Sequence, residues 1–173
     1  MLRLRPYKDC DAEYIVNWIK DERTFYKWCA GQYRHYPISA EDIREYYGQY
    51  AKADNYYQMT AFDESGPVGH LIMRFTDEEK KVLRFGFIVL NNEKRGKGYG
   101  KEMLCLALQY AFDILKVKKV TLGVFENNPA ALHCYQSVGF QESTTKEAIV
   151  YHFLGEDWKC KEMEINSTDN YYK

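Results

Sequence analysis

The sequence has no apolar run that approaches the ~20 residues a helix needs to cross a bilayer, and Met1 to Pro6 lack the apolar stretch of a secretory signal. It also lacks low-complexity linkers and internal repeats. From these absences we expect a cytoplasmic protein without a membrane partner. We expect one domain over residues 1–165, followed by a polar tail over 166–173.

Neither sign of charge is in clear excess. The chain has 24 lysines and arginines and 25 aspartates and glutamates, which give a net charge of −1. Proteins that bind nucleic acid usually concentrate basic residues on one face, so we expect no nucleic-acid partner. The 5 cysteines are odd in number, widely spaced and without a C-x-x-C pair. This is not the pattern of a disulfide framework or a cysteine zinc site, so we expect reduced thiols and no bound metal.

Hydrophobic periodicity divides the remaining sequence into short elements. Apolar or alternating runs predict strands at the start of the chain and at 57–62, 67–75, 82–90, 118–125, 148–153 and 158–165. Helical spacing predicts helices that begin near Asp9 or Asp11, after Ser39, over 99–115 and from Pro129 to near Gly139. The aromatic stretch 24–36 shows no period, so we expect it to be irregular. A strand, a helix and a strand in succession over 82–125 predict a parallel pair with a right-handed crossover.

The segment Arg95-Gly96-Lys97-Gly98-Tyr99-Gly100 lies between the strand expected at 82–90 and the helix expected at 99–115. Its glycines allow a tight turn and a close approach of the backbone to a ligand. The N-terminus of the helix would point free N–H groups and the positive end of its dipole at the same place. The segment therefore predicts a site for a phosphate or pyrophosphate group, although an exposed basic turn is the plainer interpretation.

The commoner phosphate-binding motifs do not fit this loop. A dinucleotide fold requires G-x-G-x-x-G, but the third glycine would fall on Lys101 counted from Gly96, and on Met103 counted from Gly98. The P-loop pattern G-x-x-x-x-G-K-S/T is absent, as are the H-R-D and D-F-G motifs of protein kinases. The loop therefore belongs to another class of phosphate site.

Two motifs resemble those of the Gcn5-related N-acetyltransferase (GNAT) family. Arg95, Gly98 and Gly100 meet the acyl-CoA loop pattern Q/R-x-x-G-x-G/A. Residues 128–140 meet N-x-x-A-x-x-x-Y-x-x-x-G-F. Strong matches cover about residues 85–140, and the chain resembles the branch of ribosomal-protein N-terminal acetyltransferases. The resemblance implies an α/β (α+β) fold in a single domain, with a mixed, mostly antiparallel sheet that is splayed in the middle and flanked by helices.

The resemblance also implies a donor, acetyl-CoA, which would lie in the splay between the strands at 82–90 and 118–125. The residues implied to bind it are Ile88, Val89 and Leu90 for the pantetheine arm, Arg95, Gly96, Lys97, Gly98, Tyr99 and Gly100 for the pyrophosphate, and Asn128 for the pantetheine arm or an ordered water. Tyr135 matches the general acid that protonates the departing thiolate. The plainer roles are core packing for Tyr135 and helix capping for Asn128.

The catalytic base is left open by the sequence. Many relatives carry a glutamate early on the strand before the loop, but residues 83–87 hold no carboxylate. His70, His133 or a water chain from the 26–36 region could serve instead. An α-amino group with a pKa of about 8 is far more often neutral than a lysine-like amine of about 10.4. A weak base therefore favours a peptide N-terminus as the acceptor.

These observations predict an N-acetyltransferase that moves an acetyl group from acetyl-CoA to an amine, either a peptide N-terminus or a small molecule. The missing glutamate motivates an alternative, a sensory or regulatory module that binds acyl-CoA without turnover. A domain that binds another nucleotide is a third interpretation. The final hairpin or exposed aromatic residues could form a homodimer. The acceptor pocket is expected to have walls among Phe25, Tyr26, Trp28, Tyr33, His35, Tyr36, Tyr46, Tyr47, Tyr151 and Trp158.

Overall fold

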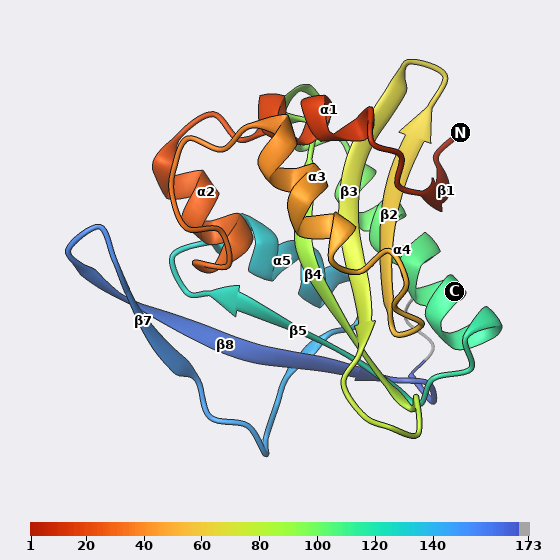
Figure 1. The fold of residues 1–173 in the computed structure, drawn as a ribbon. Helices are drawn as coiled ribbons and strands as arrows, with labels where there is room; N and C mark the ends of the chain where they lie inside the picture. The colour runs from red at the N-terminus through yellow and green to blue at the C-terminus, as the bar shows by residue number, and fades with distance from the viewer. Residues whose placement is uncertain (170–173) are drawn as a thin grey trace.

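The computed structural model describes residues 1–169 and contains one mixed sheet with helices on both faces (Figure 1). The strand order is β1-β2-β3-β4-β5-β8-β6, and β7 pairs with β8. All neighbours are antiparallel except β4 and β5. The strands are β1 (Arg3–Pro6), β2 (Tyr56–Asp63), β3 (Gly66–Phe75), β4 (Val82–Leu90), β5 (Lys119–Phe125), β6 (Gln141–Glu142), β7 (Ile149–Phe153) and β8 (Glu156–Asn166). Of the expected tail 166–173, residues 170–173 lie outside the described residues.

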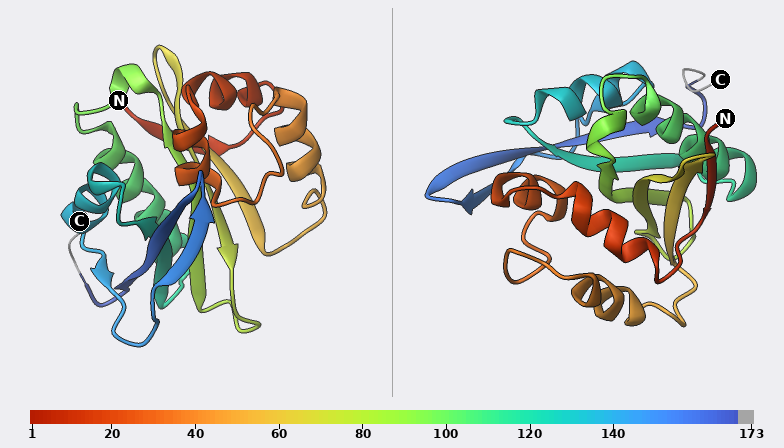
Figure 2. Two further views of the ribbon diagram at one scale, coloured as in Figure 1. Left: turned by 90° about the vertical axis from the view of Figure 1, so that its left-hand side faces the viewer. Right: turned by 90° about the horizontal axis from the view of Figure 1, so that it is seen from above.

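The helices form two layers, which the views in Figure 2 separate. The face towards the viewer in Figure 1, here called the front face, is covered by α1 (Asp11–Trp18), α2 (Glu22–Cys29) and α3 (Ala40–Gly48). The back face is covered by α4 (Tyr99–Gln109), a π-helical turn (Tyr110–Ile114) and α5 (Pro129–Ser137). Each layer encloses its own hydrophobic cluster against the sheet. No helix within residues 1–169 is long and apolar enough to span a membrane.

Two helices begin at the residues that their sequence signals predict. The Ser39 hydroxyl accepts a hydrogen bond from the Asp42 N–H at 3.1 Å, and the Asp42 carboxylate accepts one from the Ser39 N–H at 2.8 Å. This reciprocal pair is the capping box expected for α3. Asn128 caps α5, with Pro129 in the first turn. Both helices therefore start at residues whose side chains cap them.

Helix α2 contradicts the irregular structure expected over 24–36 up to Cys29, whereas residues 30–36 are irregular as expected. Asp21 caps it by accepting a hydrogen bond from the Thr24 N–H at 2.7 Å. Its buried residues include Phe25 and Trp28, which lie three apart on one face. With only 8 residues, the helix is too short to produce a clear period. Its position depends on packing against the sheet, which the local sequence does not report.

Helix α1 begins at Asp11, as the sequence predicts, but neither Asp9 nor Asp11 is its N-cap residue. The N-cap residue is Cys10, and Asp9 is exposed. Asp11 is buried and accepts hydrogen bonds from Arg5 at 2.7 and 2.8 Å and from the Thr60 hydroxyl at 2.9 Å. Burial by itself would raise the pKa of the Asp11 carboxyl. The hydrogen bonds from these donors have the larger combined effect, so the pKa lies below its usual value. The carboxylate thus ties α1 to β1 and β2.

β4 and β5 separate soon after they begin to pair. Their parallel register covers only Val82–Arg84 against Lys119–Thr121. β5 then pairs with β8 over its whole length, whereas β4 pairs with β3 on its other edge. Residues 85–90 of β4 therefore have an edge that β5 does not cover. This opening, here called the wedge, is the splay that the resemblance implies, and it confirms the predicted fold.

β4 contains a bulge at Phe87, where the strand borders the wedge. Ile72 pairs with Gly86 and His70 with Val89, so two β4 residues oppose one β3 residue between these pairs. Phe87 has a φ angle of 46°, in the left-handed region that residues other than glycine rarely adopt. An extra residue of this kind exchanges the faces on which the following side chains lie.

The packing of β4 shows this exchange directly. Before the bulge, Leu83 and Phe85 pack in the back cluster. After it, Phe87 and Val89 pack in the front cluster, although they also have odd numbers. The continuous apolar run of β4 is thus buried on both faces, as expected for a central strand, and the bulge decides which residue serves which core.

The β7–β8 hairpin extends from the body of the protein and docks on α2 (Figure 1). Tyr26 of α2 stacks on Phe153, with 4.6 Å between the ring centroids. Arg23 pairs with Glu156 at 3.1 Å and lies over the ring of Trp158. These contacts hold the hairpin against the front layer, beside the wedge.

Candidate active site

The glycine loop has the geometry that its composition predicts. Gly96 and Gly98 have φ angles of 70° and 86°, which side chains rarely tolerate. Gly98 is also the N-cap residue of α4. A Cβ atom at either position would meet nothing within 4 Å, so it is the backbone conformation that requires glycine. At Gly100 a Cβ atom would lie 3.2 Å from the Cys134 sulfur, because α4 and α5 pack closely there.

The loop presents positive charge and backbone donors to solvent. The side chains of Arg95, Lys97 and Lys101 are exposed. The Glu102 N–H donates to the Gly98 carbonyl at 3.0 Å, and the N–H groups before it in α4 have no acceptor within the helix. Together with the helix dipole, these groups favour a bound anion such as a pyrophosphate.

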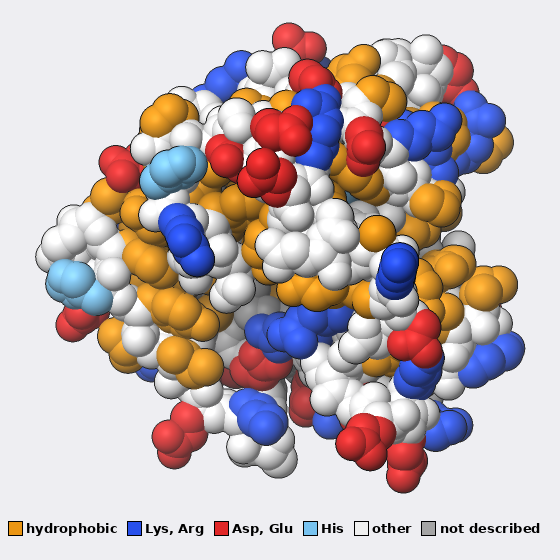
Figure 3. Space-filling view, in the orientation of Figure 1, with side chains coloured by type: hydrophobic (Ala, Val, Ile, Leu, Met, Phe, Trp, Pro, Cys, Tyr) orange, Lys and Arg blue, Asp and Glu red, His pale blue; other side chains and the backbone are white. Residues whose placement is uncertain are grey.

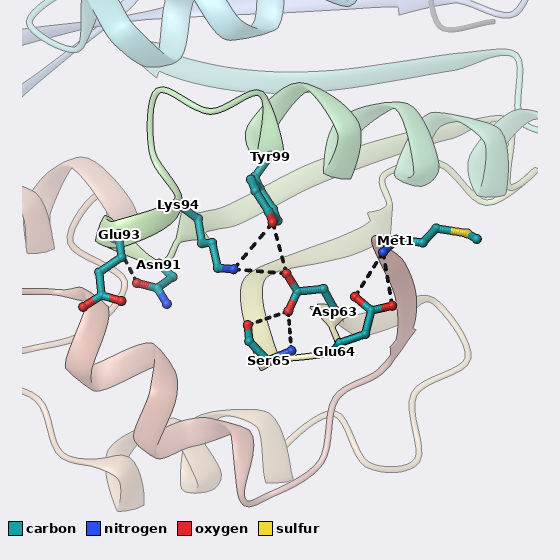
Figure 4. A network of polar contacts seen from close by, with 8 residues as sticks. All are labelled: Met1, Asp63, Glu64, Ser65, Asn91, Glu93, Lys94 and Tyr99. Atoms are coloured by element: carbon teal, nitrogen blue, oxygen red, sulfur yellow. Dashed lines mark hydrogen bonds and ion pairs between the residues drawn. The ribbon is translucent and has the colours of Figure 1, made fainter.

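A polar network ties the loop to the β2–β3 turn (Figure 4). One oxygen of Asp63 accepts hydrogen bonds from Lys94 at 3.1 Å and from the Tyr99 hydroxyl at 3.2 Å. The other accepts from the Ser65 N–H at 2.8 Å. The bonds from Ser65, and then those from Lys94 and Tyr99, hold the pKa of Asp63 well below its usual range. No sequence pattern indicates this role, because Lys94 and Tyr99 are 31 and 36 residues away along the chain.

Tyr135 lies on α5 with its ring in the back cluster. The ring meets Phe140 edge-on, with 6.2 Å between centroids. Within residues 1–169 its hydroxyl makes no hydrogen bond, and it is therefore free to donate to a ligand. Burial raises the pKa of Tyr135, so the phenol stays protonated at neutral pH. The packing role and the donor role that the sequence suggests are compatible in this position.

The residues named from the sequence lie around the wedge. Ile88, Val89 and Leu90 are on the β4 edge that β5 leaves uncovered. The loop follows the end of β4 after a short 3-10 turn (Asn92–Lys94), and Asn128 follows the end of β5 on the opposite side. Asn128 Oδ1 accepts from the Ala131 N–H at 3.4 Å, so its oxygen serves as the cap and its amide NH₂ is the group left for a ligand.

The two histidines considered as bases differ in their surroundings. His70 is fully buried, and its Nε2 lies 2.6 Å from the Tyr47 hydroxyl. Burial lowers the pKa of His70 to about 3, so the imidazole is a neutral member of the core and accepts no proton at neutral pH. His133 is exposed on α5. Neither position favours a histidine base.

The expected acceptor walls divide into core and surface. Phe25, Trp28, Tyr33 and Tyr47 are buried in the front cluster, where Trp28 stacks on Tyr33 and Tyr47 packs against Tyr56. Trp158 is a buried residue of β8, within the hairpin, and His35 is exposed. Figure 3 shows a hollow on the front face below α3, in which basic and acidic side chains meet. The approach to the wedge from this side is therefore more polar than the aromatic composition suggests.

A parallel pair that separates, with a glycine-rich anion site beyond the far end of the uncovered β4 edge, defines a protein that can hold a long phosphate-bearing ligand within its sheet. The chain belongs to the GNAT family, because residues 1–141 match the family model described as an acetyltransferase (GNAT) domain. This match confirms the family that the two motifs predict.

Several curated proteins are similar over part of their length. An uncharacterised prophage-derived N-acetyltransferase, YokL, of Bacillus subtilis is 28% identical over 118 residues, which are 68% of this chain and 66% of that protein. Spermidine N(1)-acetyltransferase of Vibrio cholerae is 40% identical over 55 residues, 32% of each chain. Spermine/spermidine N(1)-acetyltransferase of Bacillus subtilis is 40% identical over 67 residues, 38% of this chain and 44% of that protein. The matched segments thus span less than two thirds of these relatives.

The fold agrees with a solved structure over almost the whole chain. Spermidine N-acetyltransferase from Vibrio cholerae in complex with CoA and spermine superposes with a TM-score of 0.81, covering 99% of this chain and 98% of that chain at 24% identity. This likeness establishes the fold. The relatives named for a substrate act on polyamines, and they do not single out the ribosomal-protein branch that the sequence suggests.

Substitution of Gly98 by alanine tests the anion site. A side chain at a φ of 86° is strained, at a cost of about 1–2 kcal/mol, and relief of that strain would turn the first amides of α4 away from the loop. We expect the dissociation constant for CoA, measured by isothermal titration calorimetry, to rise about tenfold.

Gly48→Ala is the matched control, because Gly48 ends α3 without a positive φ and a Cβ atom there would meet nothing within 4 Å. Its affinity for CoA should equal that of the unsubstituted protein. Unchanged affinity in Gly98→Ala would contradict the assignment of the loop.

Proposed function

We propose that the protein is an N-acetyltransferase that moves an acetyl group from acetyl-CoA to the nitrogen of an amine. The observation that carries this proposal is the wedge, with the bulge at Phe87 along its β4 edge and the anion-binding loop beyond the end of that edge. Membership of the GNAT family and the names of the relatives support an enzyme over a module that binds acyl-CoA without turnover.

In this proposal the β4 edge holds the pantetheine arm. The backbone groups of Ile88, Val89 and Leu90 pair with the arm as a neighbouring strand would. The amides of residues 95–100 hold the pyrophosphate, with Arg95 and Lys97 supplying positive charge beside it. Because these donors are fixed by the fold, little freedom is lost when the ligand binds.

Acetyl transfer requires a neutral amine, donors for the developing oxyanion and a proton for the departing thiolate. A backbone N–H in the bulge region 87–90 is the preorganised donor for the oxyanion. Tyr135 supplies the proton to the CoA sulfur, since burial raises the pKa of its phenol and keeps the proton in place before reaction. The C–N bond forms, the C–S bond breaks, the sulfur leaves as a thiol, and the proton that the nitrogen loses replaces the one that Tyr135 gave.

For the acceptor we propose a polyamine, because the relatives with named substrates are spermidine and spermine acetyltransferases. A peptide N-terminus is the second candidate, in line with the branch that the motifs resemble. One observation favours it: Glu162 and Glu164 of β8 are each paired with a basic side chain, Arg84 and Lys119 respectively. Little uncompensated negative charge is then left on this part of the sheet for a polycation.

A thiol-release assay over a panel of amines tests the proposal. The protein is incubated with acetyl-CoA and with spermidine, spermine, peptides with free N-termini or lysine-containing peptides blocked at the N-terminus. We expect saturable release of CoA thiol, with the highest kcat/KM for a polyamine. A preference for free N-termini would identify the second candidate as the acceptor. Tight CoA binding without thiol release in the presence of any amine would overturn the proposed enzymatic function and favour the module that binds acyl-CoA without turnover.

Tyr135→Phe tests the general acid. Loss of the hydroxyl should lower kcat by about 100-fold, while the dissociation constant for acetyl-CoA stays unchanged because the ring still fills its place in the core. Tyr110→Phe is the matched control, since Tyr110 is a partly buried tyrosine packed against the same cluster. A kcat for Tyr135→Phe within twofold of the control would contradict the proposed role.

The homodimer, the cytoplasmic location and the absence of a metal remain predictions. β7 pairs with β8 alone among the described strands, and it exposes Ile149 and Val150. This edge is where a second copy of the chain would pair.

A further inference from the structure

The front face carries an ion pair at the point where β4 and β5 part. Arg84 is the last residue of β4 in register with β5, and its Nη1 donates to Oε1 of Glu162, on β8, at 2.5 Å. Their neighbours Leu83, Phe85 and Met163 pack in the back cluster, so strand alternation places both charged side chains on the front face. Their exposed fractions are 27% and 21%, which leaves the pair accessible to a ligand.

This ion pair crosses β5 above Gly123. Glu162 is opposite Gly123 in the β5–β8 register, two residues beyond Thr121, which is the last β5 residue to pair with β4. A Cβ atom at Gly123 would lie 3.0 Å from Nη2 of Arg84 and 3.0 Å from the sulfur of Cys160. The missing side chain thus allows Arg84 and Glu162 to meet over the strand. The carboxylate is held at the base of the wedge, where the two strands have begun to separate.

One oxygen of this carboxylate is unused. Arg84 engages Oε1, and within residues 1–169 Oε2 has no hydrogen-bond partner. Other titratable groups on this face include Arg74, opposite Arg84 on β3, and Cys160 on β8. Burial raises the pKa of the Cys160 thiol to about 11, so the thiol is neutral. Lys119 and Glu164 pair with each other at 3.0 Å. Oε2 therefore remains available to a proton donor that enters from the front face.

We propose that Glu162 is the general base that removes a proton from the acceptor amine, in place of the glutamate that residues 83–87 of β4 lack. Arg84 acts as a positioning residue that fixes the carboxylate. The inference rests on the proposed acetyl transfer, for which it supplies the missing group.

The reaction balances with the groups at hand. Oε2 of Glu162 takes a proton from the ammonium, directly or through water, and later returns it to solvent. The freed lone pair on nitrogen forms the C–N bond, and the C–S bond breaks. The thiolate takes the proton of Tyr135, which regains one from the nitrogen as the amide forms.

The pH dependence of Glu162→Gln tests this assignment, with the acceptor that gives the fastest thiol release. At pH 7 an amine with a pKa of about 10 is almost entirely protonated, so loss of the base should lower kcat by about 100-fold. The loss should shrink as the pH approaches the pKa of the amine, because a neutral amine needs no base. Acetyl-CoA affinity should not change. Glu162→Asp, which keeps a carboxylate, should recover part of the activity at pH 7.

Two further variants separate a base from a structural ion pair. Glu164→Gln removes the neighbouring pair on the same face of β8 and should leave kcat and its pH profile unchanged. Arg84→Gln breaks the same pair as Glu162→Gln but keeps the carboxylate, so it should lose less activity and retain the wild-type form of the pH profile.

Three results would count against this account, and they differ. If Arg84→Gln and Glu162→Gln lost the same amount of activity and had the same pH profile, Glu162 would not be the base, and the ion pair would have a structural role. Full activity in Glu162→Gln, with the unsubstituted protein active, would also overturn this inference alone. An unsubstituted protein that releases no thiol with any amine would overturn the proposed function itself.

Discussion

The early end of the pairing between β4 and β5 is the constraint on which the rest of the structure depends. Only Val82–Arg84 and Lys119–Thr121 are in register, and beyond them each strand keeps a partner on its far side. Backbone N–H and C=O groups require partners when they are removed from water. The uncovered edge of β4 is therefore a place where an extended ligand can complete the hydrogen bonding of the sheet.

The remaining features follow in series along that edge. The bulge at Phe87 places Phe87 and Val89 in the front core, whereas Leu83 and Phe85 before it lie in the back core, so both helical layers hold the strand in place. The glycine loop and the first turn of α4 follow the strand, and Asp63 ties Lys94 and Tyr99 to the neighbouring turn. The part of the site proposed to bind acetyl-CoA is thus built mainly from consecutive residues of the chain. The carboxylate of Asp63, which is distant in the sequence, reinforces it.

Features formed by consecutive residues could be predicted from the sequence, whereas features formed by residues far apart in the chain could not. The loop, the apolar run of β4, the capping box at Ser39 and the motif around Tyr135 are local patterns, and the structure has the expected elements at each of them. Asp63 and Glu162 could not be found in this way, because each acquires its place through pairing with residues far along the chain. The bulge is similar, since nothing about a phenylalanine demands a positive φ; it results from the register of β3 against β4.

The most direct test of the central claim, that the ligand completes the edge of β4, is amide hydrogen exchange followed by NMR with and without saturating CoA. The account predicts slower exchange at amides of residues 88–90 and in the first turn of α4, with the amides of residues 59–62 of β2 unchanged because β1 and β3 already cover both edges there. Saturating CoA that leaves exchange along residues 88–90 unaltered, or that protects a different strand, would contradict it.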